Sequence, residues 1–294
     1  MNIGVDVGGT KIRTGLVKDG RVVKHIKVLT GADKGKKHVL KQIIKTIKKV
    51  MSSDVKGIGV GVPGAVDNNR ARAVNLPNIP SLNKTNLKLI LEKEFKKKVV
   101  LGNDSNAFTL AESVSGAGRG SRNVVGLTLG TGVGGGLVIN QQIYTGKCCA
   151  GEAGHITINH MGRKCSCGGR GCLEEYVSAR AITRYSKELI GRGLKPRAVE
   201  DKAREGDEKA VMVYQRAGEY LGAGLVTINN LMHPDLIIIG GGLSKADYLI
   251  IKPAREVLKS NGFFKPSKVV KAKLGSDAGV IGASYLTQPS YLST

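Results

Sequence analysis

The sequence predicts an α/β protein of two domains, and three observations lead to that fold class. Strand patterns alternate with helix patterns along the chain, which is typical of α/β folds. A chain of 294 residues is too long for one small core. A pattern of strand, glycine-rich turn, strand, turn and strand occurs twice, at residues 3–28 and 125–144. We interpret this recurrence as a diverged internal duplication.

In the first part of the chain, short apolar alternations predict strands, and apolar residues at helical spacing predict helices. Asp19-Gly20 is a strong hairpin turn signal between two of the strand patterns. The expected strands are residues 2–7, 12–17, 22–28, 55–62 and 99–101. The expected helices are residues 39–50, 87–95 and 107–114.

The second part of the chain continues the alternation without a low-complexity linker. The expected strands are residues 124–129, 136–139 and 236–239. The expected helices are residues 179–190, 199–205, 208–231, 247–259 and 279–286. We expect a small domain over residues 1–106 and a large domain over 107–279, with the helix in 280–294 packing back onto the small domain.

The net charge of +23 raises the question of a nucleic-acid partner, because basic surfaces neutralise phosphates. The basic runs at 34–49 and 93–98 lie on amphipathic helix patterns, and aromatic residues, at 4%, are not interleaved with them. We therefore favour a solvated basic surface on a protein whose substrate is an anionic nucleotide, with no specific nucleic-acid partner.

Two features bear on the compartment. No apolar stretch reaches the roughly 20 residues that a membrane span needs. The first residues, 1–7, form a strand pattern and not a signal peptide. We expect a cytoplasmic protein without a membrane partner.

The first chemical motif is a strand that ends in an acid, two glycines, a hydroxyl and a cation: Asp6, Gly8, Gly9, Thr10 and Lys11. Glycine turns let backbone N–H groups face phosphate oxygens, and the last two side chains add donors. Asp6 could hold Mg²⁺ through water, because magnesium keeps several of its waters. Taken alone, the motif also fits an ordinary hairpin turn.

Two further glycine loops strengthen the nucleotide interpretation. Residues 130–136 contain the spacing G-x-G-x-G, but no helix pattern opens after it, which disfavours a dinucleotide fold. Residues 240–242 form a similar loop after a buried strand. Three such loops fit a nucleotide held between two duplicated domains better than three unrelated turns. The candidate residues here are Thr131, Gly132, Gly134, Gly241 and Gly242.

All five cysteines fall within 25 residues, which indicates a metal site more than a disulfide framework. Cys165, Cys167 and Cys172 offer thiolates, and His155 offers a ring nitrogen. A Cys₃His set is a common closed tetrahedral zinc site, so we expect a structural Zn²⁺. Cys148 and Cys149 are left without a function.

The chain resembles the ROK family (repressors, open reading frames and kinases), within the actin-like and hexokinase-like superfamily. The resemblance covers essentially the whole length. Its most specific elements are Asp6-x-Gly-Gly-Thr-Lys11, Asn75-x-Pro-Asn78, Asn103-Asp104, Gly151-Glu152-x-Gly-His155 and Cys165-x-Cys167-Gly-x-x-Gly-Cys172-x-Glu174. It implies a two-domain actin-like, ribonuclease-H-like ATPase fold with an interdomain cleft. It also implies the use of ATP and phosphorylation at the 6-position of a sugar.

The resemblance assigns roles to residues that carry no functional signal by themselves. An Asn-Asp pair between a strand and a helix is most simply a helix cap. The family makes Asp104 the general base and lets Asn103 orient the sugar. It places the sugar hydroxyls at Glu152, His155 and Glu174, and it matches Gly64 and Asn78 to positions that line the same pocket.

These expectations lead to an ATP-dependent hexokinase that converts glucose to glucose 6-phosphate. An N-acetylglucosamine or N-acetylmannosamine kinase is the alternative, because the matched residues hold hydroxyls common to all three sugars. A sugar-responsive repressor is disfavoured, since the phosphate motif starts at Asp6 and leaves no room for a preceding helix-turn-helix. A sugar-binding protein without catalysis is disfavoured by Asp104, Lys11 and the glycine loops. We also expect a homo-oligomer, either a dimer or a tetramer.

Overall fold

The computed structural model describes residues 1–67 and 71–292. The first sheet has five strands in the order β3-β2-β1-β4-β7. Their bounds are β1 (Asn2–Val7), β2 (Lys11–Lys18), β3 (Arg21–Leu29), β4 (Gly57–Val62) and β7 (Lys98–Asn103). The strands β1, β4 and β7 are parallel, whereas β2 and β3 continue the sheet as antiparallel hairpins. The predicted strands of this part are therefore confirmed.

The second sheet repeats the first in strand order. It runs β10-β9-β8-β11-β12. Its strands are β8 (Val124–Leu129), β9 (Val133–Ile139), β10 (Gln142–Tyr144), β11 (Leu236–Gly240) and β12 (Lys268–Lys271). If the strands of each sheet are numbered 1 to 5 in chain order, both sheets have the spatial order 3-2-1-4-5. This shared order supports the internal duplication. Sequence patterns missed β12 and a small hairpin of β5 (Ala65–Val66) and β6 (Ala73–Asn75).

Except for a four-residue helix at Glu174–Val177, which no pattern predicted, the helices agree with the periodic patterns, with shifts at their ends. They are α1 (Gly35–Val50), α2 (Leu87–Phe95), α3 (Asp104–Ser115), α4 (Glu174–Val177), α5 (Ala179–Ile190), α6 (Pro196–Arg204), α7 (Glu208–Met232), α8 (Asp247–Asn261) and α9 (Ala278–Tyr285). The helix α3 begins three residues before the expected start, because Asn103 caps it. The helix α6 also begins earlier, with Pro196 at its first turn, where a missing N–H is harmless.

The chain divides into two compact units. Unit 1 comprises Met1–Arg122, Gly136–Gly151 and Lys273–Thr294, and unit 2 comprises Asn123–Gly135 and Glu152–Ala272. The expected domain boundary at residue 106 stays a prediction.

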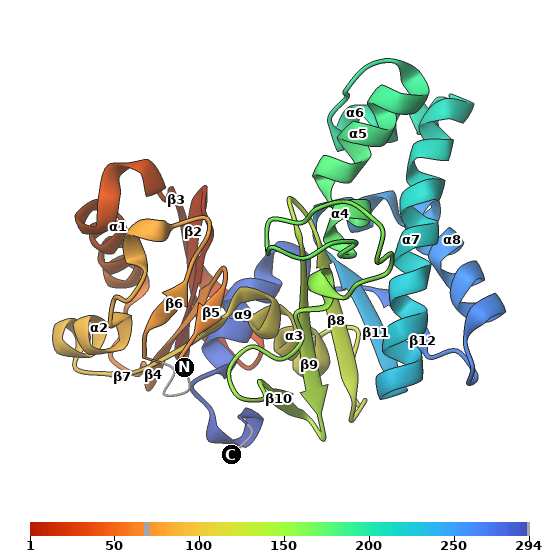
Figure 1. Ribbon diagram of the computed structural model, residues 1–294. Helices are drawn as coiled ribbons and strands as arrows, with labels where there is room; N and C mark the ends of the chain where they lie inside the picture. Colours follow the sequence, from red (N-terminus) through yellow and green to blue (C-terminus); the bar gives the residue numbers. More distant parts are fainter. Residues whose placement is uncertain (68–70, 293–294) are drawn as a thin grey trace. The chain divides into compact units, whose positions relative to one another are not determined.

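In unit 1, the two faces of the first sheet are covered by different helices (Figure 1). Figure 1 shows α1 and α2 on one side of the sheet and α9 on the other. Side chains alternate along β1, so Ile3 and Val5 join a buried cluster that includes Ile43 of α1. Gly4 faces α9, and a Cβ there would lie 1.8 Å from the carbonyl oxygen of Val280. The missing side chain therefore lets α9 pack directly on the strand.

In unit 2, parallel pairing joins β8 to β11 and β11 to β12. All five residues of β11 are buried, as expected for a central parallel strand. The long helices α7 and α8 pack against each other (Figure 1), and α8 contacts β12. The buried residues of α7 and α8 therefore form part of the core of unit 2, together with those of β8 and β11.

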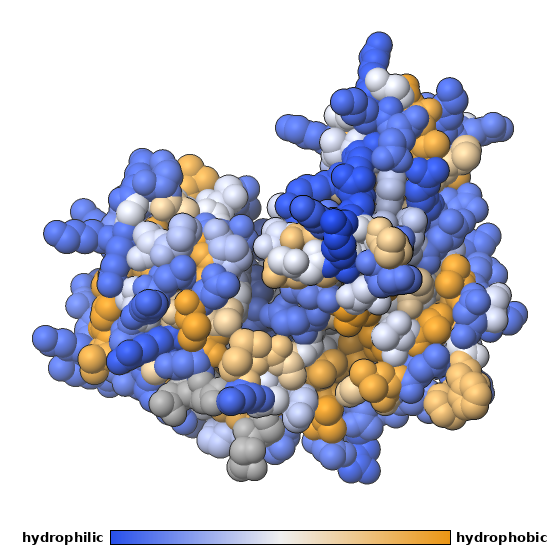
Figure 2. Space-filling view, in the orientation of Figure 1, coloured by the Kyte–Doolittle hydropathy of each residue, from blue (hydrophilic) through white to orange (hydrophobic). Residues whose placement is uncertain are grey.

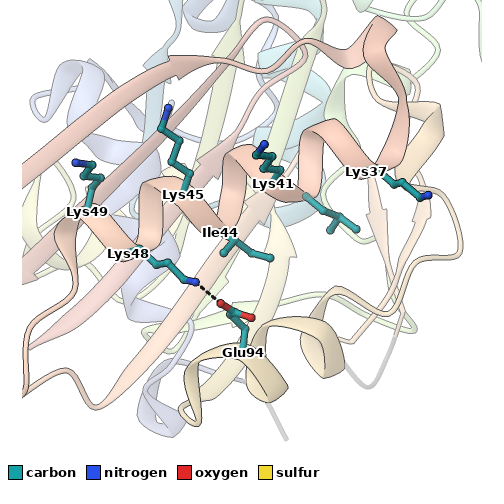
Figure 3. Close-up of a pocket in the computed structure, with 8 residues that line it drawn as sticks. Lys37, Lys41, Ile44, Lys45, Lys48, Lys49 and Glu94 are labelled. Atoms are coloured by element: carbon teal, nitrogen blue, oxygen red, sulfur yellow. Dashed lines mark ion pairs between the residues drawn. The ribbon is translucent and has the colours of Figure 1, made fainter.

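The outer face of α1 carries the basic run that the sequence placed on an amphipathic helix. Val39, Ile43 and Ile47 are buried, whereas the lysines of the helix are exposed. A shallow groove of about 800 Å³ runs along this face, and Lys48 pairs with Glu94 of α2 at 2.5 Å (Figure 3). Figure 3 shows Lys41, Lys45 and Lys49 projecting away from Glu94. None of the predicted site residues lines this groove.

The visible surface is largely hydrophilic, with hydrophobic residues in smaller patches (Figure 2). Over residues 1–67 and 71–292, no helix combines the length and the apolar character that a bilayer crossing requires.

Candidate active site

In unit 1, the predicted residues gather at one edge of the first sheet. The strands β1, β4 and β7 are parallel, so their carboxyl ends meet at the same edge, where α/β proteins bind ligands. The register pairs Asp6 with Gly61, and Val62 with Asn103. The acid of the first motif and the Asn103-Asp104 pair therefore lie two strands apart on this edge.

Asn103 is the N-cap of α3, so the helix-cap alternative holds for this residue. Its Oδ1 accepts hydrogen bonds from the N–H groups of Ser105, at 2.8 Å, and Asn106, at 3.0 Å. Its Nδ2 donates to the carbonyl oxygen of Gly64 at 3.2 Å. The same amide therefore starts α3 and ties β7 to the loop after β4.

Asp104 is the first residue of α3 and is half-buried. Its Oδ1 accepts a hydrogen bond from the Ser105 N–H at 2.8 Å. The positive end of the helix dipole stabilises a negative charge at this position. An ionised carboxylate is the form that a general base needs.

Asp6 lies on the face of β1 that α9 covers. A Cβ on Gly279 of α9 would come within 2.8 Å of its Oδ2, so glycine leaves room for the carboxyl group. Burial raises the pKa of Asp6, and the charge of Arg13 partly opposes that rise. Arg13 lies opposite Asp6 on β2 and donates to the carbonyl oxygen of Ser276 at 2.6 Å. No sequence signal singled out Arg13.

The turn between β1 and β2 is fixed by backbone and hydroxyl contacts. The Gly8 N–H donates to the Lys11 carbonyl at 2.9 Å, and the Thr30 hydroxyl donates to the Gly8 carbonyl at 2.6 Å. Thr10 and Lys11 are exposed at its tip. A Cβ on Gly9 would lie 2.9 Å from the Cβ of Asn78. The predicted phosphate turn thus adjoins a predicted sugar residue.

Unit 2 carries its glycine loops at the carboxyl ends of β8 and β11, which are neighbouring parallel strands. Gly241 has φ of +86°, and a Cβ there would lie 2.3 Å from the Leu129 carbonyl oxygen. Only glycine fits this close approach. Gly242 has open space where a Cβ would stand. Thr131, beside Gly132, is exposed, and Gly134 is half-buried. These backbones can therefore approach a ligand closely.

Glu174 holds the first of these loops. Its Oε2 accepts a hydrogen bond from the Val133 N–H at 2.9 Å, and its Oε1 accepts one from Arg180 Nη2 at 2.9 Å. A Cβ on Gly132 would lie 2.3 Å from Oε2. The structure thus gives Glu174 protein partners on the glycine loop, which sequence reasoning did not foresee. Its contact with a sugar stays a prediction.

The four predicted metal ligands lie together in unit 2. One ligand atom from each of His155, Cys165, Cys167 and Cys172 lies within 4.8 Å of the others. His155 Nδ1 is 3.7 Å from Cys165 Sγ, and Cys167 Sγ is 3.6 Å from Cys172 Sγ. With Zn–S bonds of about 2.3 Å, two tetrahedral sulfurs stand about 3.8 Å apart. This Cys₃His cluster therefore fits a tetrahedral metal ion.

The chemistry of the thiols points the same way. Burial raises the pKa of Cys172 to about 12, so this sulfur stays a protonated thiol without a cation beside it. A hydrogen bond from the backbone of Gly169 lowers the pKa of Cys167. A bound metal deprotonates its thiol ligands outright, which would resolve the cost of burying Cys172.

Backbone hydrogen bonds link the Cys₃His cluster to Glu152, and they join the segment after His155 to the segment before Glu174. The His155 N–H donates to the Glu152 carbonyl at 2.9 Å, and the Leu173 N–H donates to the Ile156 carbonyl at 3.0 Å. Cys165, Glu174 and Glu175 also have ligand atoms within 4.8 Å of one another. Partial desolvation raises the pKa of Glu152, His155 opposes this, and Glu174 adds to it. The two segments therefore form one connected loop structure.

Comparison with known proteins places the whole chain in one family. The model of the ROK family matches residues 2–290. A glucokinase of Thermotoga maritima is 38% identical, with 96% of this chain and 95% of the relative covered. An N-acetyl-D-glucosamine kinase of Vibrio cholerae is 32% identical, with 97% and 99% covered. The crystal structure of a ROK family glucokinase from Streptomyces griseus, in complex with glucose and AMPPNP, has a TM-score of 0.84 at 35% identity and covers 97% and 98%. The chain belongs to the ROK family.

Proposed function

We propose that this protein is an ATP-dependent hexokinase that phosphorylates the 6-hydroxyl of a hexose, with glucose as the favoured sugar. The observation that carries the proposal is the placing of Asp104 beside the Asn103 cap, on the same sheet edge as the glycine turn after Asp6. A base and a phosphate-binding turn on one edge are what phosphoryl transfer to a hydroxyl requires. Glucokinases among the relatives support the choice of glucose.

In the proposed reaction, the Asp104 carboxylate accepts the proton of the sugar 6-hydroxyl. The oxygen forms a bond to the γ-phosphorus while the bond from that phosphorus to the ADP oxygen breaks in line. Asn103 and Asn78 would orient the sugar, with Glu152, His155 and Glu174 on its hydroxyls. Gly64 shapes the loop that Asn103 holds. The protein thus contributes positioning and one proton acceptor.

The ATP phosphates would be held by the N–H groups of the glycine loops and by Thr10 and Lys11. The AMPPNP in the Streptomyces griseus complex supports ATP as the donor. Magnesium, when bound, supplies neutralisation of charge on the phosphate oxygens. Asp6 is the carboxylate that would hold it through water, and ionisation there would be eased by a cation, since burial raises the pKa of this group.

We assign a structural zinc to the Cys₃His cluster. Four protein ligands leave no open position for activating water, so zinc would take no part in phosphoryl transfer. Its role would be to hold the segments of Glu152 and Glu174 in place. The sulfur and nitrogen spacing supports this assignment.

N-acetylglucosamine and N-acetylmannosamine are the second candidate substrates. The Vibrio cholerae relative supports the former. Assembly into a dimer or tetramer is a separate proposal, which sedimentation of the purified protein measures.

The test is ADP release, coupled to an enzymatic readout, across a panel of glucose, mannose, N-acetylglucosamine and N-acetylmannosamine. We expect the largest kcat/KM for glucose. A larger kcat/KM for an N-acetylated sugar would make that sugar the assigned substrate. The absence of sugar-dependent ADP release with every sugar would contradict the proposed function.

A further inference from the structure

Two adjacent cysteines lie outside the Cys₃His cluster. Cys148 is exposed and Cys149 is half-buried, and their Sγ atoms are 2.7 Å apart. They occupy the turn after β10, where the Ala150 N–H donates to the Thr145 carbonyl at 3.0 Å. In the Cys₃His cluster, by contrast, Cys167 and Cys172 keep their sulfurs 3.6 Å apart, the spacing of two ligands around one ion. The adjacent pair is therefore spaced for sulfur–sulfur chemistry.

We propose that Cys148 and Cys149 form a vicinal dithiol that is oxidised reversibly by small disulfides. The Cys148 thiolate attacks the disulfide, forms a mixed disulfide and releases one small thiolate. The Cys149 thiolate then attacks the Cys148 sulfur, closes the Cys148–Cys149 bond and releases the second thiolate. The small disulfide takes up the two electrons, and the two protein thiols supply the two protons.

The geometry makes such a bond labile. Adjacent Cα atoms lie about 3.8 Å apart, whereas disulfides usually join Cα atoms about 4.4–6.8 Å apart. A bond between neighbouring residues is therefore strained and easily reduced. Strained, exposed disulfides have high reduction potentials and are the regulatory kind. The pair is thus built to respond to the redox state and not to staple the fold.

The position of the pair gives the oxidation a consequence. Cys149 precedes Glu152 by three residues, and Gly151 between them has φ of +92°. Closing the ring would change the backbone at 148–149 and so displace Glu152. This consequence rests on the proposed function, in which Glu152 binds a sugar hydroxyl. Misplacing one charged hydrogen bond would raise the sugar KM by roughly tenfold or more.

Trypsin separates the two sets of thiols, which makes the test direct. Cleavage after Lys147 and Arg163 yields a peptide of residues 148–163 that contains Cys148 and Cys149 and no other cysteine. The cluster cysteines fall in the peptides 165–170 and 171–180. Metal-replete protein is treated with oxidised glutathione, alkylated and digested. We expect the 148–163 peptide to lose two hydrogens and to escape alkylation, and dithiothreitol to reverse this.

The variants Cys148→Ser and Cys149→Ser are the controls, since neither residue belongs to the proposed catalytic or zinc set. Each should stop at a mixed disulfide, and the double variant should have a sugar KM that oxidised glutathione does not change. Full alkylation of the oxidised wild-type peptide would overturn the site. A disulfide without a rise in the sugar KM would overturn its link to Glu152. The mass measurement needs no activity, so it also separates a failure of this proposal from a failure of the proposed function.

Discussion

The two five-stranded sheets share one strand order but carry different chemistry at their parallel strand ends. On the first sheet, Asp6 pairs in register with Gly61, and on the second, Thr128 pairs with Gly240. An acid on the first copy thus corresponds to a hydroxyl on the second. Both copies end their strands in glycine turns. The duplicated fold therefore supplies backbone N–H groups twice, whereas the carboxylates at the strand ends, Asp6 and Asp104, come from the first copy alone.

Removing the proposed base, which follows the first sheet's strand β7, should have the largest effect. Asp104→Asn keeps the shape of the side chain but removes the proton acceptor. We expect kcat to fall by about 10²–10⁴ with little change in the sugar KM. The control is Asp207→Asn, because Asp207 also lies at a helix start, as the N-cap of α7, where it accepts the Ala210 N–H, and asparagine caps equally well. Near-normal turnover of Asp104→Asn would refute the assignment.

The second effect in size concerns the Cys₃His cluster of unit 2. Cys172→Ser should lose the metal, lower the thermal stability and raise the sugar KM together, because the ion would hold the segments of Glu152 and Glu174. Glu152→Gln should raise the sugar KM, by roughly tenfold, while the metal stays stoichiometric. Elemental analysis beside kinetics distinguishes the two variants. A metal-free Cys172→Ser protein with a normal sugar KM would show that the cluster does not support sugar binding.

A smaller effect sharpens the contrast between Asp6 and its counterpart Thr128. The pKa of Asp6 is raised in the folded state, so its ionised form destabilises the fold at any pH above the pKa that Asp6 has in the unfolded chain. This penalty disappears as the pH falls through the folded-state pKa. Asp6→Asn should therefore stabilise the nucleotide-free protein at neutral pH, by about 1 kcal/mol or roughly 2–4 °C, and not at acid pH. Calorimetry at both pH values measures it. Equal or lower stability at neutral pH would contradict the burial argument.

The smallest effect concerns the basic face of α1. We expect any affinity for duplex DNA to be independent of sequence and to fall steeply with salt. The triple variant Lys41→Gln, Lys45→Gln and Lys49→Gln should flatten that salt dependence and leave sugar phosphorylation unchanged. Lys187→Gln, Lys252→Gln and Lys259→Gln together remove the same charge from unit 2. A site-selective footprint at physiological salt would show a specific DNA-binding protein instead.

Most of the fold could be predicted from the sequence, because its elements are long enough to show a period. The helices α2 and α5 and the strand β8 have the predicted bounds. The hairpin β5–β6 has strands of two and three residues, which is too short for an alternation. The strand β9 begins at Val133 and not at Gly136, because a glycine run has no side-chain pattern.

The site could be predicted in kind but not in its contacts. Spacing indicated the Cys₃His set, since its ligands are close in sequence. Other contacts depend on strand register and loop packing. Glu174 accepts hydrogen bonds from Val133 and Arg180, and Arg13 lies opposite Asp6. One sequence carries no signal for such contacts.

The most direct test of the reaction is the identity of its product. Glucose labelled with ¹³C at carbon 6 is incubated with ATP, magnesium and the protein, and the ¹³C NMR spectrum is recorded. We predict that the carbon 6 signal becomes split by coupling to phosphorus, and that Asp207→Asn gives the same spectrum while Asp104→Asn leaves the signal unsplit over the same time. An unsplit carbon 6 signal with wild-type protein, or a phosphate on another carbon, would contradict phosphorylation at the 6-hydroxyl of glucose.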